Sequence, residues 1–162
     1  MSVLYAEHFG FRRAPFSIAP DPAFLFRTPS HREAYAHLRY GIETDGGFVL
    51  LTGDVGTGKT TLCRALVDAL ADDVDLAYVL NPAQGVEDLL VTLCEELGAP
   101  EPDGDRPPAG SSTKMLIDRL TAHLLAQHAA GRRTLVLIDD AQNLDRAVLE
   151  QIRLLTNLET DR

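Results

Sequence analysis

The sequence predicts an α/β domain with a parallel sheet, because short β-prone runs alternate with longer segments of helical periodicity. The predicted strands are residues 48–51, 76–80 and 135–138. Parallel strands need crossover connections, and the segments between these strands have the length and apolar spacing of helices. We therefore expect helices on both faces of the sheet, in three layers of α/β/α type.

Two segments precede the first predicted strand. Residues 1–28 are rich in aromatic residues and proline, which suits an ordered arm packed on the core rather than a regular element. Ser30 and Glu33 have the spacing of a capping box, which predicts a helix that runs to about Glu43.

Three helices are expected after the second predicted strand. The first covers residues 86–97 and ends at Gly98, and the second covers about 113–129. Between them, residues 99–112 hold four of the nine prolines and predict a flexible loop. Asp145 can cap the last helix, whose apolar stripe consists of Val148, Ile152, Leu155 and Leu158.

The strongest functional signal is the run Gly-Asp-Val-Gly-Thr-Gly-Lys-Thr-Thr at residues 53–61. It fits the phosphate-loop pattern G-x-x-x-x-G-K-[ST], with Gly53, Gly58, Lys59 and Thr60 at the fixed positions. The alternative is a glycine turn that binds nothing. Four fixed positions between a predicted strand and a predicted helix favour the phosphate loop.

We expect this loop to bind ATP together with Mg²⁺. Lys59 supplies a positive charge for the β- and γ-phosphates, and Thr60 supplies a hydroxyl for the metal. The N-terminus of the following helix adds partial positive charge. The nucleotide-binding residues are Gly53, Asp54, Val55, Gly56, Thr57, Gly58, Lys59, Thr60 and Thr61.

A pair of acids follows the third predicted strand. The β-prone run 134–138 ends in Asp139 and Asp140. A carboxylate at the tip of a buried parallel strand is the usual partner of a phosphate loop, so we expect Asp139 to hold Mg²⁺ through water. Asp140 is the candidate catalytic base for the attacking water, beside Lys59 as the other catalytic residue. The alternative is an Asp-Asp pair that caps the next segment.

Composition restricts the classes of protein that remain. The chain has 162 residues, of which 45% are hydrophobic, enough for one sizeable core. Its net charge of −9 argues against a broad nucleic-acid surface. The histidines lack metal-site spacing, and Cys63 and Cys94 suit reduced thiols. No stretch resembles a signal peptide or a membrane span.

These motifs resemble a known family, the ExeA-like AAA+ ATPases of general secretion pathway protein A. The similar segments are FGFRRAPFSIAPDP (9–22), SHREA (30–34), GFVLLTGDVGTGKTT (47–61), DDAQNL (139–144) and LLTNLET (154–160). The resemblance implies a P-loop ATPase at the cytoplasmic side of a bacterial inner membrane. It would assist a secretion or pilus-type system, self-associate through its AAA+ domain and act beside a membrane-anchored partner.

The chain departs from the family pattern at one acid. The family has Asp-Glu where this sequence has Asp139-Asp140, and aspartate is shorter by about 1.5 Å. We expect nucleotide binding to survive this change and hydrolysis to be slow. The resemblance also suggests Gln142 and Asn143 as relays to a neighbouring subunit. Arg153 on the last helix could face such a subunit, although a solvated arginine is the better interpretation.

The family pattern also continues beyond Arg162, with a sensor strand, an arginine finger and a helical lid. We therefore expect a C-terminally incomplete domain: residues 1–28 as the arm and 29–162 as the N-terminal part of the AAA+ domain. The missing strand would lie between the first and third predicted strands. These two strands must then pair directly or leave a gap, so we expect the isolated chain to be unstable and to show little ATPase activity.

Two other functions stay open from the sequence alone. The short Asp140 is compatible with a switch that binds ATP and hardly turns it over. A transposition-helper ATPase bound to DNA is the third candidate, which the acidic balance disfavours.

Overall fold

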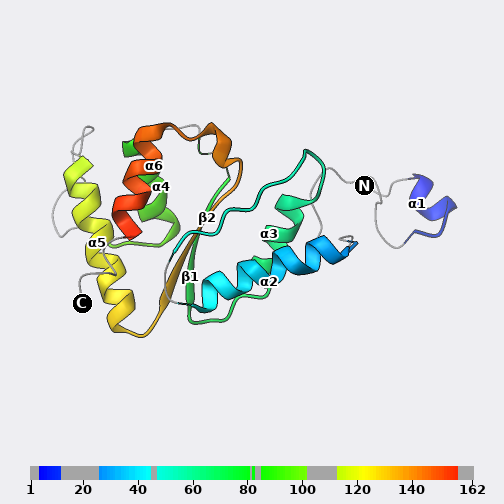
Figure 1. Cartoon of the computed structure of the whole chain (residues 1–162), viewed down its shortest axis with the longest axis horizontal. Helices are drawn as coiled ribbons and strands as arrows, with labels where there is room; N and C mark the ends of the chain where they lie inside the picture. Colours follow the sequence, from blue (N-terminus) through cyan, green and yellow to red (C-terminus); the bar gives the residue numbers. More distant parts are fainter. Residues whose placement is uncertain are drawn as a thin grey trace. The chain divides into compact units, whose positions relative to one another are not determined.

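The computed structural model describes residues 4–11, 26–44, 47–80, 82, 85–101 and 113–156 (Figure 1). Its described elements are α1 (Leu4–His8), α2 (Pro29–Glu43), α3 (Lys59–Val67), β1 (Val74–Val79), α4 (Val86–Glu96), α5 (Thr113–Ala129), β2 (Arg133–Ile138), the 3₁₀ turn η2 (Ala141–Asn143) and α6 (Arg146–Thr156). The chain divides into two units. One consists of Met1–His37 with Leu50–Ala69, and the other of Leu38–Val49 with Leu70–Arg162.

The second unit contains a parallel pair of strands. β1 and β2 pair in the register Val74↔Arg133 to Val79↔Ile138, as the two β-prone runs predicted. The N–H of Asp139 donates to the carbonyl of Val79 at 2.9 Å, which extends the ladder by one step. The parallel pairing is therefore confirmed, with β1 beginning at Val74, before the predicted start.

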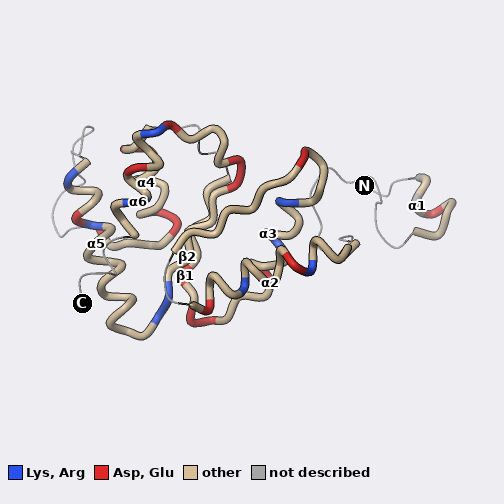
Figure 2. Tube along the Cα trace, in the orientation of Figure 1, with Lys and Arg blue, Asp and Glu red and all other residues tan. Residues whose placement is uncertain are grey.

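Ion pairs hold the ends at which the two strands begin. Arg133 contacts Asp73 at 3.0 Å, and Arg132 forms an ion pair with Asp75. Figure 2 shows basic and acidic segments together where the strands begin. Elsewhere the basic residues are scattered along the described chain, and no continuous basic stripe is seen there.

The core of this unit lies between the sheet and the helices α4, α5 and α6. α4 packs on β1 and on α5, α5 packs on β2, and α6 packs on α4 (Figure 1). The most deeply buried core side chains are Leu89, Leu90, Leu93, Cys94, Leu120, Ala77 and Val148. Each large apolar side chain contributes roughly 1.5–3 kcal/mol on burial, so this layer supplies much of the stability of the unit. One helical layer on a parallel sheet is thus confirmed, and the third layer stays a prediction.

The helix boundaries within this layer agree with the sequence pattern. α5 covers the predicted residues 113–129, and α4 begins at Val86. Gly98 follows α4 with a φ of 62° and donates its N–H to Glu95 at 3.1 Å, as expected for a C-terminal cap. Most of the predicted flexible loop, residues 102–112, lies outside the described residues, as does Leu158.

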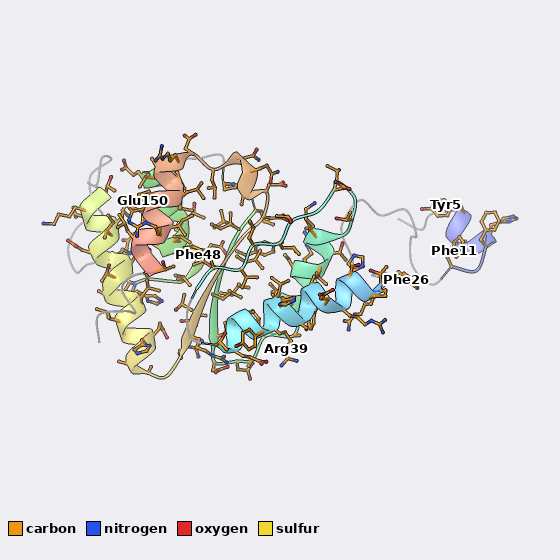
Figure 3. All side chains as sticks on the ribbon, in the orientation of Figure 1. Tyr5, Phe11, Phe26, Arg39, Phe48 and Glu150 are labelled. Carbon is orange, nitrogen blue, oxygen red and sulfur yellow. The ribbon has the colours of Figure 1, made fainter. Side chains whose placement is uncertain are left out.

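The first predicted strand is wrong within the described residues. Residues 48–51 belong to no helix or strand and pair with no described strand. Phe48, which is labelled in Figure 3, is 63% exposed, and Leu50 is 80% exposed, so the run is not buried. An apolar run predicts that a segment suits a sheet, but a strand forms only where a neighbour supplies ladder hydrogen bonds. Within the described residues, the first and third runs form no ladder with each other.

The start of α2 is also corrected. The helix begins at Pro29, and the hydroxyl of Thr28 accepts the N–H of His31 at 3.2 Å. Thr28 is therefore the N-cap, in place of Ser30 with Glu33. Proline at the first helical position has a preset φ and no N–H to satisfy, which explains the earlier start.

The predicted arm is described only in part. Residues 4–8 form α1, although no regular element was expected there. Phe9, Phe11 and Phe26 are 66%, 47% and 83% exposed, so these three aromatic side chains are not packed on the core (Figure 3). Phe9 and Phe11 instead contact each other, with ring centroids 5.9 Å apart. Aromatic content indicates a tendency to pack but does not identify the partner. Phe16 and Phe24 of the arm fall outside the described residues.

The described residues hold neither a membrane-spanning helix nor a cluster of metal-ligating side chains. No helix there is both long enough and apolar enough to cross a membrane. Within the same residues, no group of three or more His, Cys, Asp or Glu side chains could hold a metal ion.

Candidate functional site

The predicted phosphate loop lies in the first unit and takes a shape that depends on two glycines. Gly56 has a φ of 80° and Gly58 has a φ of 87°, a region that residues with a Cβ rarely adopt. α3 begins directly after Gly58, which offers no side-chain cap. The first N–H groups of a helix have no intrahelical acceptor, so this start of α3 presents donors suited to an anion.

The side chain of Lys59 lies along the loop. Its Nζ donates to the carbonyls of Gly53 and Asp54, each at 2.9 Å. The hydroxyl of Thr57 donates to the same carbonyl of Asp54 at 2.8 Å. These contacts connect the beginning of the loop to the start of α3. They hold the ammonium charge beside the loop backbone.

The residues of the loop fit a phosphate group. A lysine charge, a helix N-terminus and glycine backbone are gathered within residues 53–61. At Gly56, no atom lies within 4 Å of the position that a Cβ would take, so the backbone is open to close approach. The side chain of Val55 is fully exposed, with a relative accessibility of 101%. Such an arrangement is suited to an anion, and phosphate binding by residues 53–61 stays a prediction.

His31 is a contact of this loop that the sequence did not reveal. Its Nε2 lies 2.7 Å from the carbonyl oxygen of Thr57, and its Nδ1 lies 2.6 Å from the hydroxyl of Thr28. The start of α2 is thereby bound to the middle of the phosphate loop. His31 lies in the segment SHREA (30–34), which resembles the family. Neither that segment nor the spacing of the histidines indicates the contact with Thr57, because the contact joins residues that are distant in sequence.

The acidic pair lies at the end of β2, in the second unit. Asp139 continues the ladder, and its Oδ1 accepts the N–H of Asp140 at 3.0 Å. Asp140 has a φ of 53° and a ψ of 38°, a left-handed conformation. Asp140 also accepts the side-chain amide of Gln142 at 3.0 Å, and its carbonyl accepts the N–H of Asn143 at 3.0 Å. The acids are therefore the beginning of the turn η2 as well as the tip of a strand.

The predicted magnesium ligands fall in different units. Thr60 is half-buried at the start of α3, and Asp139 is half-buried after β2. Each has the chemistry expected of it, and their joint metal site stays a prediction.

Arg153, the candidate for a subunit contact, has a partner on its own helix. Its guanidinium contacts both carboxylate oxygens of Glu150, at 2.7 Å and 2.9 Å, and both side chains are more than half exposed. The hydrogen bond from Arg153 lowers the pKa of Glu150 below its usual value. The solvated interpretation of Arg153 fits these contacts.

A comparison with protein families identifies the class of protein to which the chain belongs. The family model described as "AAA domain" matches residues 42–162, which is most of the chain and includes both the phosphate loop and the acidic pair. The chain belongs to the AAA domain family. This family implies the P-loop nucleoside-triphosphatase fold, consistent with the α/β elements and the parallel sheet.

A particular relative has a matching sequence over nearly the whole chain. General secretion pathway protein A of Aeromonas hydrophila is 50% identical over 158 residues, which is 98% of this chain. The chain spans 28% of the length of that protein. The predicted resemblance to ExeA-like ATPases is thus confirmed. No solved structure shows significant similarity to the chain.

Proposed function

We propose that the chain binds ATP with Mg²⁺ through residues 53–61. The observation that carries this proposal is the loop itself, in which Lys59 and the start of α3 direct positive charge to one short stretch of glycine-rich backbone. The nucleotide contacts are the backbone of Gly53, Asp54, Val55, Gly56, Thr57, Gly58, Lys59, Thr60 and Thr61.

The proposed mechanism assigns one task to each polar residue. Lys59 exchanges its contacts with the carbonyls of Gly53 and Asp54 for phosphate oxygens, a charge-assisted bond. Thr60 and Asp139 would hold Mg²⁺, which neutralises phosphate charge when bound. Asp140 accepts the proton of the attacking water.

Two further residues adjust the proposed base. Gln142 holds one oxygen of Asp140, which leaves the other oxygen for water. Gln142 and Asn143 would also relay the state of the site to a neighbouring subunit.

At the level of the whole protein, we propose an AAA ATPase that assists assembly of a bacterial secretion or pilus-type system. The similarity to general secretion pathway protein A supports this pathway. Self-association through the AAA domain and a membrane-anchored partner at the cytoplasmic face of the inner membrane belong to the same proposal.

A switch that binds ATP with little turnover is the second candidate. The side chain of Asp140 is short, which limits its reach toward water, and one of its two oxygens accepts a hydrogen bond from Gln142. The rate of phosphate release at saturating ATP distinguishes the two candidates, because a hydrolysing ATPase releases phosphate continuously and a switch does not.

The test of nucleotide binding is Lys59→Ala in a titration with fluorescently labelled ATP. Loss of a charge-assisted contact should weaken binding by at least ~2 kcal/mol, or about 30-fold. Lys114→Ala is the matched control, because Lys114 is exposed on α5 and outside the loop. Equal affinity of the Lys59 variant and the unchanged protein would remove the phosphate-loop assignment.

A further inference from the structure

Thr57 lies in the middle of the phosphate loop, and all of its polar groups have partners. Its N–H and its hydroxyl both donate to the carbonyl of Asp54, at 3.3 Å and 2.8 Å. Its carbonyl accepts a hydrogen bond from Nε2 of His31 at 2.7 Å. The first two contacts are local. The third comes from α2, 26 residues earlier in the chain.

The neighbours of His31 determine which ring nitrogen carries the proton. A carbonyl oxygen only accepts, so Nε2 must be the donor to Thr57. The hydroxyl of Thr28 accepts the backbone N–H of His31 at 3.2 Å and lies 2.6 Å from Nδ1. Its own proton can therefore bond Nδ1. A ring that carries a proton on Nε2 satisfies the carbonyl of Thr57.

This contact determines the orientation of one peptide group in the loop. In a planar trans peptide, the C=O and the following N–H point in opposite directions. The carbonyl of Thr57 points to His31, so the N–H of Gly58 points away from it. Gly56 and Gly58 on either side have positive φ and the wide conformational range of glycine. Without the contact to His31, this peptide would have fewer restraints on its rotation.

We propose that His31 is a positioning residue for the phosphate loop. It holds the Thr57–Gly58 peptide so that the N–H of Gly58 and the start of α3 are aligned for the phosphates of a nucleotide. The inference rests on the proposed nucleotide binding and adds a residue from outside the motif. Through Thr28, the same histidine connects the loop to the N-cap of α2.

A purely structural role for His31 gives a different expectation. The cap of α2 needs only the backbone N–H of His31, which any residue except proline supplies. His31→Phe therefore keeps the cap and the ring shape but removes the donor to Thr57. His31→Gln replaces the ring with an amide whose N–H₂ can still donate to a carbonyl. A structural role predicts that both variants bind nucleotide alike, whereas positioning predicts rescue by glutamine.

The experiment measures the dissociation constant of a fluorescent ATP analogue with Mg²⁺, together with thermal unfolding without nucleotide. We expect His31→Phe to weaken binding about tenfold, the value of one hydrogen bond that orders the site, and His31→Gln to stay within about threefold of the unchanged protein. His37→Phe is the control, because His37 is exposed on the same helix. It should leave binding unchanged.

Unchanged affinity in His31→Phe would overturn the inference, as would His31→Gln binding no better than the phenylalanine variant. Should His31→Phe fail to fold, the glutamine variant decides the matter, because weak binding by a folded His31→Gln protein also overturns the inference. Lys59→Ala separates the two proposals. If Lys59→Ala loses affinity while His31→Phe does not, only the positioning role fails; if neither loses affinity, nucleotide binding by this loop fails.

Discussion

The left-handed backbone at Asp140 leads to a prediction in which the usual effects of glycine and alanine are reversed. Asp140 is the non-glycine residue with positive φ among those that the structure describes. Replacing it with Gly or with Ala removes the same carboxylate and the same bond to Gln142. The difference in stability between Asp140→Gly and Asp140→Ala therefore reports only the effect of the left-handed backbone conformation.

The magnitude follows from two opposing effects. A Cβ in the left-handed region costs roughly 1–2 kcal/mol, a strain that glycine does not have. Glycine loses more conformational freedom on folding, which costs about 0.5–1 kcal/mol relative to alanine. The strain outweighs the loss of freedom, so Asp140→Gly should be more stable than Asp140→Ala by about 1 kcal/mol. For a chain of this size, this corresponds to a difference in Tm of about 2–4 °C.

Thermal and urea unfolding followed by circular dichroism would measure the difference. Ala122→Gly is the control, since Ala122 is exposed in the middle of α5, where glycine should destabilise by about 1 kcal/mol. If Ala is more stable than Gly at position 140 as well, the backbone there is not left-handed. The acidic pair would then not form the start of a turn.

Three other predictions concern the acid, the thiols and an ion pair. Asp140→Glu should raise ATP turnover without changing ATP affinity, because a longer base acts mainly on the transition state; an unchanged rate would mean that Asp140 is adequate or is not the base. Iodoacetamide should modify the half-buried Cys63 before Cys94, because Cys94 is only 1% exposed and burial raises the pKa of its thiol. Faster labelling of Cys94 would contradict this prediction. Because the pKa of Glu150 is lower in the folded protein, the carboxylate contributes stability. This contribution is fully present above the pKa of Glu150 in the unfolded chain and is lost as the pH falls through its pKa in the folded protein. Arg153→Gln should therefore move the NMR titration midpoint of Glu150 upward, and an unmoved midpoint would show that the ion pair is absent in solution.

Much of the fold was predictable because its signals are local. The apolar spacing of α4 and α5 and the glycine after α4 depend on residues within a few turns of each other. The β-prone runs at residues 76–80 and 135–138 likewise overlap the two paired strands. In the phosphate loop, Gly56 and Gly58 have the positive φ values that make glycine necessary in such a turn.

The sequence by itself thus determined the α/β class, the helices of the core and the glycines of the turn at residues 53–61. The tertiary structure alone decided that residues 48–51 join no described strand, that Thr28 caps α2 and that His31 contacts Thr57. It also decided that Asp140 begins a left-handed turn. Periodicity and glycine placement act through neighbouring residues, whereas strand pairing and the contact of His31 depend on which distant groups the folded chain brings within hydrogen-bonding distance.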